Sequence, residues 1–190
     1  MKRYELVDYE QAPADVRVIY DEFLRATGSA KVPVWVRSLG ANATLLEAYW
    51  ERTKGSLLRG SLPAILKELT IFVVSVENGS RYCSACHAHA ALSMDATLKF
   101  EQLDSLTRPG DTSAGLPPAY RAALDFAIAV ARDANSVPDS AFERLRDADF
   151  SEDEIRELLS VIDLAAMFNN YTSAMKLPLD PEYRPVLDPV

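Results

Sequence analysis

The chain has 190 residues, of which 48% are hydrophobic and 25% are charged, a balance typical of a globular protein that buries a sizeable core. Its 28 acidic side chains outnumber 20 basic ones, which argues against a broad nucleic-acid-binding surface. No stretch is long and apolar enough to span a bilayer, and the first residues lack the apolar core of a secretory signal. We therefore expect one cytoplasmic domain over residues 1–190, with no membrane or nucleic-acid partner.

The residue pattern predicts an all-α fold. Only 7 glycines are present, and Ala, Leu, Glu and Arg recur three and four residues apart, as in stacked amphipathic helices. The first helix is expected from Pro13 to about Ala26, and Gly28 ends it. A short turn at residues 32–39 then leads to a second helix around residues 41–58.

The middle of the chain contains the most apolar predicted helix. Pro63 opens it, and it ends near Gly79. A helix that is apolar nearly all round should be buried, so the acidic Glu68 within it is unusual. The next helix is expected to start at Ser80, with the serine side chain as its cap, and to continue to Met94.

The second half of the chain is also predicted to be helical. A shorter helix is expected at residues 96–106, followed by a loop at residues 107–115. An amphipathic helix is expected at residues 120–133 and a short helix at residues 138–146. Ser151 and Glu154 occupy the positions of a capping box, which opens a long helix through about residue 175. The proline-rich residues 178–190 are predicted to form an extended tail.

The only two cysteines and the only two histidines fall within seven residues, Cys83-Ser84-Ala85-Cys86-His87-Ala88-His89. Packing alone gives no reason to gather four scarce reactive side chains, so this window indicates thiol chemistry. With about 100° per residue, Cys83, Cys86 and His87 share a helix face, whereas His89 points away from Cys83. His87 is therefore the candidate base for Cys83. The imidazole and the positive end of the helix dipole are expected to lower the pKa of this thiol.

Other interpretations of the window stay open at this point. Two cysteines three residues apart also occur by coincidence or as half of a metal site. Zinc needs four tetrahedral ligands, which two turns of one helix cannot supply without a second segment, so we expect no metal. Taken alone, Glu68 is a solvated helix residue or a salt-bridge partner, His89 a surface histidine and Tyr82 a packing residue.

A longer pattern surrounds the window. After Glu68 come eleven residues and then Ser80, followed by Cys83 and His87 at the spacing x-x-C-x-x-x-H. This pattern resembles the motif of the alkylhydroperoxidase D and carboxymuconolactone decarboxylase-like family, in its peroxidase-related branch. The family motif is Glu, eleven residues and Cys-x-x-Cys-x-x-x-His, so its first cysteine falls on Ser80. Further similar segments extend the resemblance over most of residues 40–175, the expected core: Lys67-Glu68-Leu69, Asn78-Gly79, Tyr82-Cys83 and Asp125 through Phe168-Asn169-Asn170.

The resemblance implies a multi-helix orthogonal bundle of the alkylhydroperoxidase D type, in a homo-oligomer of unspecified subunit number. It also implies a thiol-dependent peroxidase, in which Glu68 polarises His87 and His87 deprotonates Cys83 for attack on a hydroperoxide. Since Ser80 cannot form the family's disulfide, Cys86 is the only substitute partner. A dithiol or thioredoxin-like donor would restore the thiols, and no cofactor is required.

The sequence also allows two alternative functions. The family's decarboxylase branch uses acid/base residues without redox cysteines, so lactone or decarboxylase-type chemistry is one alternative, against which Cys83 and Cys86 count. A non-catalytic redox-sensing protein is the other, because Ser80 replaces the family's first cysteine. The sequence names neither the peroxide nor the electron donor, and it assigns no role to His89.

Overall fold

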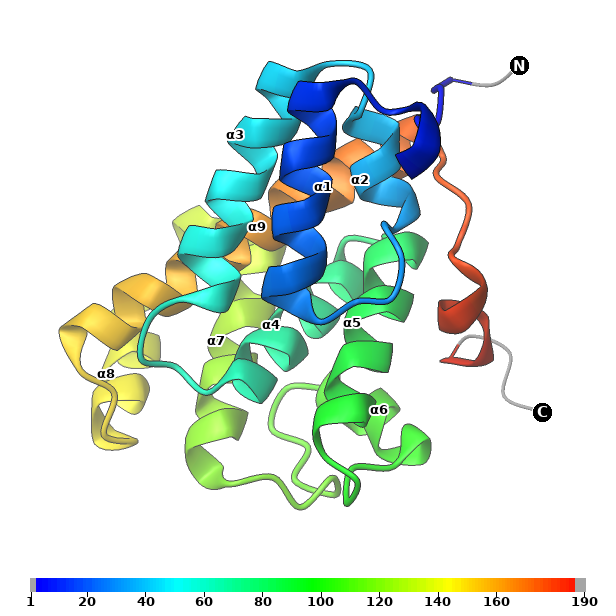
Figure 1. Cartoon of the computed structure of the whole chain (residues 1–190). Coiled ribbons are helices and arrows are strands. Elements are labelled where there is room, and N and C mark those ends of the chain that lie inside the picture. Colours follow the sequence, from blue (N-terminus) through cyan, green and yellow to red (C-terminus); the bar gives the residue numbers. More distant parts are fainter. Residues whose placement is uncertain (1–2, 187–190) are drawn as a thin grey trace.

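The computed structural model describes residues 3–186 and confirms the all-α fold (Figure 1). Within that range there are nine α-helices and no β-strand. The helices are α1 (Ala14–Thr27), α2 (Val34–Leu39), α3 (Ala43–Thr53), α4 (Ala64–Glu77), α5 (Arg81–Met94), α6 (Phe100–Leu106), α7 (Pro118–Asp133), α8 (Asp139–Asp147) and α9 (Glu152–Met175). A π-helical turn, η2 (Lys54–Leu58), continues α3, and short 3-10 helices lie at η1 (Tyr9–Gln11), η3 (Ala134–Ser136) and η4 (Pro181–Val186).

Helix α4 lies at the centre of the molecule. It packs against α5, α7 and α9, and residues 66–75 are all buried, as a helix that is apolar on every side requires. The helix ends at Glu77, Gly79 follows two residues later with φ of 66°, and the Ser80 N–H donates to the Ser75 carbonyl at 2.8 Å. The chain therefore reverses tightly, and α4 and α5 lie side by side (Figure 1).

Local capping signals explain where the first and last helices begin or end. Gly28, at φ of 68°, ends α1 and donates its N–H to the Leu24 carbonyl at 3.0 Å. The capping box of α9 is formed as predicted. The Ser151 hydroxyl accepts from the Glu154 N–H at 3.2 Å, and the Glu154 carboxylate accepts from the Ser151 N–H at 2.9 Å.

Three local predictions are wrong. The segment 32–39, predicted to be a short turn, contains the helix α2. Ser80 is the N-cap residue of α5, but its side chain makes no capping hydrogen bond and lies 3.3 Å from the Thr172 hydroxyl instead. The tail is not extended throughout, because η4 forms a 3-10 helix that packs on α5. Contacts with distant parts of the chain determine both the partner of the Ser80 side chain and the conformation of the tail. Residues 187–190 of the predicted tail lie outside the described range.

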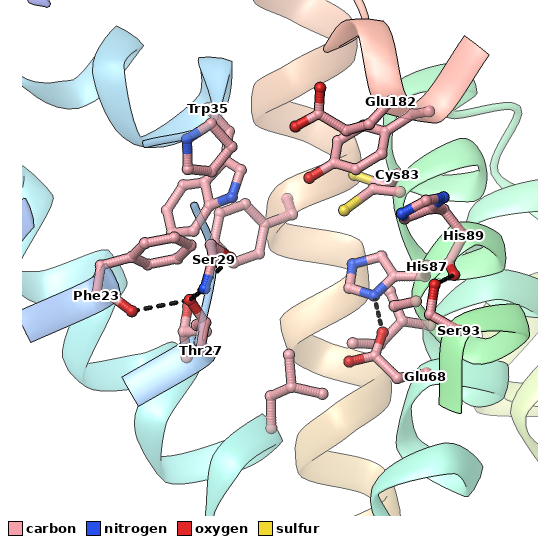
Figure 2. A pocket seen from close by; sticks show the side chains of 18 of the residues that line it. Phe23, Thr27, Ser29, Trp35, Glu68, Cys83, His87, His89, Ser93 and Glu182 are labelled. Atoms are coloured by element: carbon pink, nitrogen blue, oxygen red, sulfur yellow. Dashed lines mark hydrogen bonds and ion pairs between the residues drawn. The ribbon is translucent and has the colours of Figure 1, made fainter. Parts of the chain in front are cut away.

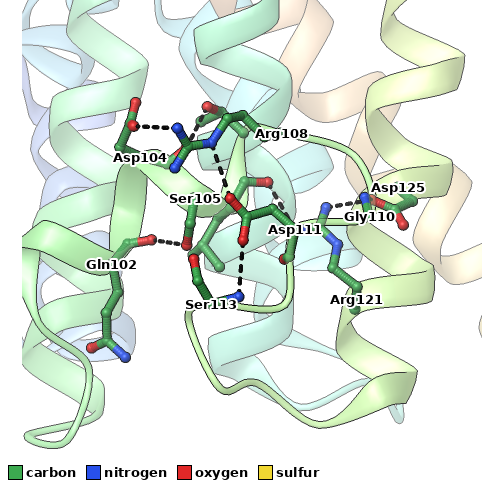
Figure 3. A network of polar contacts seen from close by, with 11 residues as sticks. Gln102, Asp104, Ser105, Arg108, Gly110, Asp111, Ser113, Arg121 and Asp125 are labelled. Carbon is green, nitrogen blue, oxygen red and sulfur yellow. Dashed lines mark hydrogen bonds and ion pairs between the residues drawn. The ribbon is translucent and has the colours of Figure 1, made fainter.

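The predicted loop at residues 107–115 is held by polar contacts to α7 (Figure 3). The Gly110 N–H donates to the Asp125 carboxylate at 3.0 Å, and Arg121 pairs with the same carboxylate at 2.6 Å. The buried Arg121 guanidinium also donates to the Leu106 carbonyl at 3.2 Å. These bonds satisfy backbone groups that α6 and the loop leave unpaired.

The remaining elements surround the central pair α4 and α5. Helices α1 and α3 pack on each other, and α9 crosses behind them to contact α4, α5 and α7 (Figure 1). After α9 the chain turns back, which places η4 against α5. Within residues 3–186, every helix is too short or too polar to cross a bilayer.

Candidate active site

The predicted acid and base form a close pair. Glu68, one turn into α4, is 7% exposed, and its Oε2 lies 2.6 Å from Nδ1 of His87 on α5. An ionised carboxylate accepts the Nδ1 proton, which leaves Nε2 of the neutral ring as an acceptor. Figure 2 shows His87 between Glu68 and Cys83. The pair can therefore take up a proton and stabilise the imidazolium that results.

Cys83 lies deeper and has hydroxyl neighbours. It is 2% exposed, and its Sγ is 3.4 Å from the Thr172 hydroxyl oxygen. Thr172 gives its single hydroxyl proton to the Phe168 carbonyl at 2.9 Å, so towards the sulfur it acts as an acceptor. In this arrangement the Cys83 thiol is the donor and is protonated.

The expected lowering of the Cys83 pKa is wrong. Burial raises the pKa of this thiol, and this effect outweighs hydrogen bonding to Thr172 and Ser80, which lowers it. Among the described residues, no hydrogen bond joins His87 to Cys83. The His87 ring is bonded to Glu68, and the Cys83 sulfur is bonded to Thr172. The position of Cys83 in the first turn of α5 does not compensate for its loss of water.

Cys86 has different surroundings. It is partly exposed, and both cysteines are free thiols. Although part of the residue is accessible, the surrounding side chains remove its sulfur from water, which raises the pKa of Cys86 strongly. The charge of Glu68 raises this pKa further, and hydrogen bonding with the Tyr183 side chain lowers it. The charge of Glu68 thus acts on the Cys86 sulfur as well as on the imidazole.

One cavity of about 820 Å³ connects these groups. One side of it is lined by the polar and sulfur-containing residues Glu68, Cys83, Cys86, His87 and His89. The other side carries the aromatic rings of Phe23, Trp35 and Phe168, and Figure 2 shows Phe23 and Trp35 facing His87 across the cavity. A cavity of this size and lining suits a small organic molecule. Among the described residues, no three or more His, Cys, Asp or Glu side chains are grouped as metal ligands.

The structure adds residues that the sequence patterns did not identify. Thr172 comes from α9, and Tyr183 comes from η4, whose ring lies 5.5 Å from that of His89. Trp35 comes from α2 and lies 4.8 Å from the Phe168 ring. Each belongs to a segment far from the cysteines in sequence. The only sequence signal near any of them was the resemblance at Phe168 to Asn170, one turn before Thr172.

Residues 43–109, which contain the four predicted site residues, match the carboxymuconolactone decarboxylase family. The predicted family resemblance is confirmed. A comparison with curated proteins found no match.

Several solved structures share the fold of this chain. An alkylhydroperoxidase AhpD core, an uncharacterized peroxidase-related protein from Ralstonia eutropha JMP134, superposes with a TM-score of 0.83 at 22% identity, covering 96% of this chain and 94% of that one. A peroxidase-related protein from Silicibacter sp. TM1040 gives 0.78 at 23% identity, covering 90% and 87%. The debrominase Bmp8 in complex with 2,3,4-tribromopyrrole gives 0.78 at 22% identity, covering 92% and 90%.

Proposed function

We propose that the protein is a thiol-dependent peroxidase whose reacting groups are Cys83, Cys86, His87 and Glu68. The observation that carries this proposal is the 2.6 Å contact between Glu68 and His87 in a cavity that both cysteines also line. This contact leaves one ring nitrogen free to accept a proton from a thiol. A buried thiol with a raised pKa needs such a base before it can react.

In the first step Cys83 transfers its proton to His87 through a water molecule or the peroxide itself, since the two side chains are not directly bonded. The Thr172 hydroxyl can turn to donate to the thiolate that forms. The thiolate attacks one peroxide oxygen, the O–O bond breaks, and Cys83 becomes a sulfenic acid. The leaving alkoxide takes the proton from His87 and departs as an alcohol.

In the second step Cys86 attacks the sulfenic sulfur of Cys83. A disulfide forms, and water leaves. Residues three apart on a helix have Cα atoms about 5 Å from each other, which is within the range of a disulfide. A dithiol or a thioredoxin-like protein then reduces the disulfide and supplies the two electrons of the cycle.

We include the cellular location, the oligomeric assembly and the cofactor requirement of the protein in this proposal. A cytoplasmic location would supply the reducing partners that the cycle needs. Assembly into a homo-oligomer is supported by the resemblance to the family. No cofactor is needed, because sulfur itself carries the electrons.

Replacing Cys83 by serine tests the proposal. We expect Cys83→Ser to reduce the consumption of cumene hydroperoxide with dithiothreitol to the uncatalysed rate, because serine cannot be oxidised in this way. Ser84→Ala is a matched control on the same helix, since its hydroxyl bonds only the Arg81 carbonyl and does not line the cavity. Full turnover by Cys83→Ser would refute the assignment.

The mass of the protein after one equivalent of peroxide separates the remaining alternatives. We expect the parent protein to lose two thiols and Cys86→Ser to retain a sulfenic acid. An acid/base decarboxylase would keep its activity after thiol alkylation, unless the adduct blocks the cavity. A redox sensor would oxidise once but show no repeated turnover with any dithiol.

A second candidate function is the reductive removal of halogen from an aromatic ring. The aromatic side of the cavity, with Phe23, Trp35 and Phe168 opposite the thiols, favours it, as does the shared fold of a debrominase solved with a brominated pyrrole. A thiolate would take the bromine, His87 would protonate the ring carbon, and the second thiol would release bromide as the disulfide forms. Bromide release from 2,3,4-tribromopyrrole, measured by ion chromatography, tests this candidate.

A further inference from the structure

The chain after α9 returns to the thiol site and covers one face of α5. The Tyr183 ring of η4 lies 6.1 Å from the Tyr82 ring and 5.5 Å from the His89 ring. Cys86 follows Tyr82 by four residues and precedes His89 by three, so the three share one helix face. The Tyr183 ring therefore lies over Cys86, between the two aromatic neighbours of this cysteine.

A buried carboxylate fixes the segment in this place. Asp180, which is 5% exposed, accepts hydrogen bonds from the Val34 N–H at 3.0 Å and from the Tyr82 hydroxyl at 2.6 Å. It thereby joins the start of η4 to α2 and α5. The position of Tyr183 over the cysteine follows from this anchor, three residues earlier in the chain.

The two cysteines have different hydroxyl partners. Cys83 lies beside the Thr172 hydroxyl of α9, whereas the Tyr183 hydroxyl is the partner that lowers the pKa of Cys86. The ionisable groups around Cys86 come from three elements. They are Glu68 on α4, Tyr82, Cys83, His87 and His89 on α5, and Asp180, Glu182 and Tyr183 on the C-terminal segment. Of these, Tyr183 is the group whose hydrogen bond lowers the pKa of Cys86, whereas the charges of Glu68 and Asp180 raise it.

We propose that Tyr183 is a positioning residue for Cys86, whose sulfur it covers with its ring and stabilises as a thiolate with its hydroxyl group. This inference rests on the proposed function in so far as Cys86 is the resolving thiol. In that step Cys86 releases its proton and its sulfur bonds to that of Cys83. The S–O bond of the sulfenic acid breaks, and the hydroxide takes up a proton and leaves as water.

Alkylation of a protein with Cys86 as its only thiol tests the inference without any peroxide. In a Cys83→Ala background we expect Tyr183→Phe to slow alkylation by iodoacetamide by roughly tenfold at each pH between about 7 and 9. The reason is that only the thiolate reacts and it loses a charge-assisted hydrogen bond. The phenyl ring keeps the contacts with Tyr82 and His89. Intact mass against time gives the rate, and N-ethylmaleimide should be slowed by the same factor.

Two controls make the result specific. Tyr171→Phe removes a hydroxyl that lies 3.0 Å from the Ser38 hydroxyl and away from the cavity lining, and it should leave the rate unchanged. In a Cys86→Ala background, Tyr183→Phe should not slow the alkylation of Cys83. Equal rates with and without the Tyr183 hydroxyl would overturn the inference, as would factors that differ between the two reagents, since these report altered access. A protein without peroxidase activity would still give the same alkylation rates, so the two proposals fail separately.

Discussion

The acid–base pair at the centre of the site is a buried one. A carboxylate that is 7% exposed is costly to keep ionised unless it has a strong partner, and Glu68 has one in His87 at 2.6 Å. The same charge lies near Cys86, where it opposes ionisation of the thiol. In the proposed reaction the carboxylate would stabilise an imidazolium that has taken the proton of a thiol, and the imidazolium would pass this proton to the leaving alkoxide.

Glu68→Gln separates the charge of this side chain from its shape. The amide can still accept the Nδ1 proton of His87, but it no longer stabilises an imidazolium. We expect the rate of peroxide consumption to fall by about 10- to 100-fold, in line with the loss of general acid–base assistance. Stopped-flow measurement of peroxide consumption at saturating dithiol gives this rate.

Glu77→Gln is the matched control for this variant. Glu77 lies on the same helix but pairs with Arg132 near the surface, at 2.9 Å. Its replacement should change the rate by less than about twofold, because a surface pair of this kind contributes little. A Glu68→Gln protein as active as the Glu77→Gln protein would show that the buried carboxylate has no part in the reaction.

The resemblance to the family motif was sufficient to find the pair, but no sequence pattern described the surroundings of the thiols. The motif placed Glu68 and His87 on consecutive helices, and the short turn between these helices brings the two side chains together. The pKa of Cys83 depends on burial by α9, which no local pattern contains. Thr172 and Tyr183 were missed for the same reason, since only the tertiary fold brings them to the cysteines.

Among the secondary-structure elements, α4 and α9 share a buried ion pair. The Lys67 ammonium, with its side chain 2% exposed, lies 2.5 Å from the Glu157 carboxylate. That carboxylate also accepts from the Ser61 N–H at 2.8 Å. Gly60 has φ of 104°, and a Cβ there would lie 2.1 Å from a Glu157 oxygen. The turn before α4 is therefore shaped around this carboxylate.

Glu157→Gln should be strongly destabilising, because it leaves the buried Lys67 ammonium without a countercharge. We expect the free energy of unfolding to fall by about 3 kcal/mol, as for other broken buried pairs. Glu152→Gln on the same helix removes an exposed partner of Arg146 and should cost less than about 1 kcal/mol. Urea denaturation followed by circular dichroism measures both, and equal losses would contradict the assignment.

The same pair makes a contribution to stability that depends on pH. Burial raises the pKa of Glu157, but hydrogen bonds from Lys67 and Ser61 outweigh it and hold the pKa below the ordinary value of 4.5. A carboxyl group with a lowered pKa in the folded state stabilises the protein above its unfolded pKa, and this stability is lost as the pH falls below it. The stability of Glu157→Gln should accordingly decline less than that of the parent protein as the pH falls below 4.5.

Helix ends were predictable where a local signal fixes them. Gly28 ends α1 and Ser151 opens α9 through their own backbone and side-chain geometry, and both were predicted. The π-helical turn η2 and the 3-10 helix η4 were not predicted, because their hydrogen bonding depends on what packs against them. Asp180 is such a tertiary contact for η4, since it is anchored on α2 and α5.

Across the whole molecule, segments distant in sequence enclose the thiol cavity. Helices α4 and α5 supply Glu68, Cys83, Cys86 and His87, α1, α2 and α9 supply the aromatic side, and η4 packs on α5. The all-α fold class could be predicted from composition and periodicity, because helix signals are local. The cavity could not, because its volume depends on how these elements pack. A single domain over residues 1–190 stays a prediction.

Removal of the Asp180 anchor tests whether the C-terminal segment closes the cavity. In Asp180→Ala the buried Val34 N–H and the Tyr82 hydroxyl lose their acceptor, so docking of η4 should weaken. Burial is the main cause of the raised pKa of Cys86, so undocking should speed its alkylation in a Cys83→Ala background even though the Tyr183 hydroxyl is lost as well. We expect an increase of roughly tenfold, the size of effect expected when a thiol loses part of its desolvation.

Hydrogen exchange of residues 177–184 supplies a readout that does not depend on the thiols. Their amides should exchange faster in Asp180→Ala, whereas those in the centre of α4 should be unchanged, since local opening leaves the core intact. Glu182→Ala is the matched control, because this exposed carboxylate lies in the same short segment and has no buried donor to satisfy. Faster exchange without faster alkylation would show that the segment moves without covering Cys86. Unchanged exchange would show that Asp180 does not hold it in place.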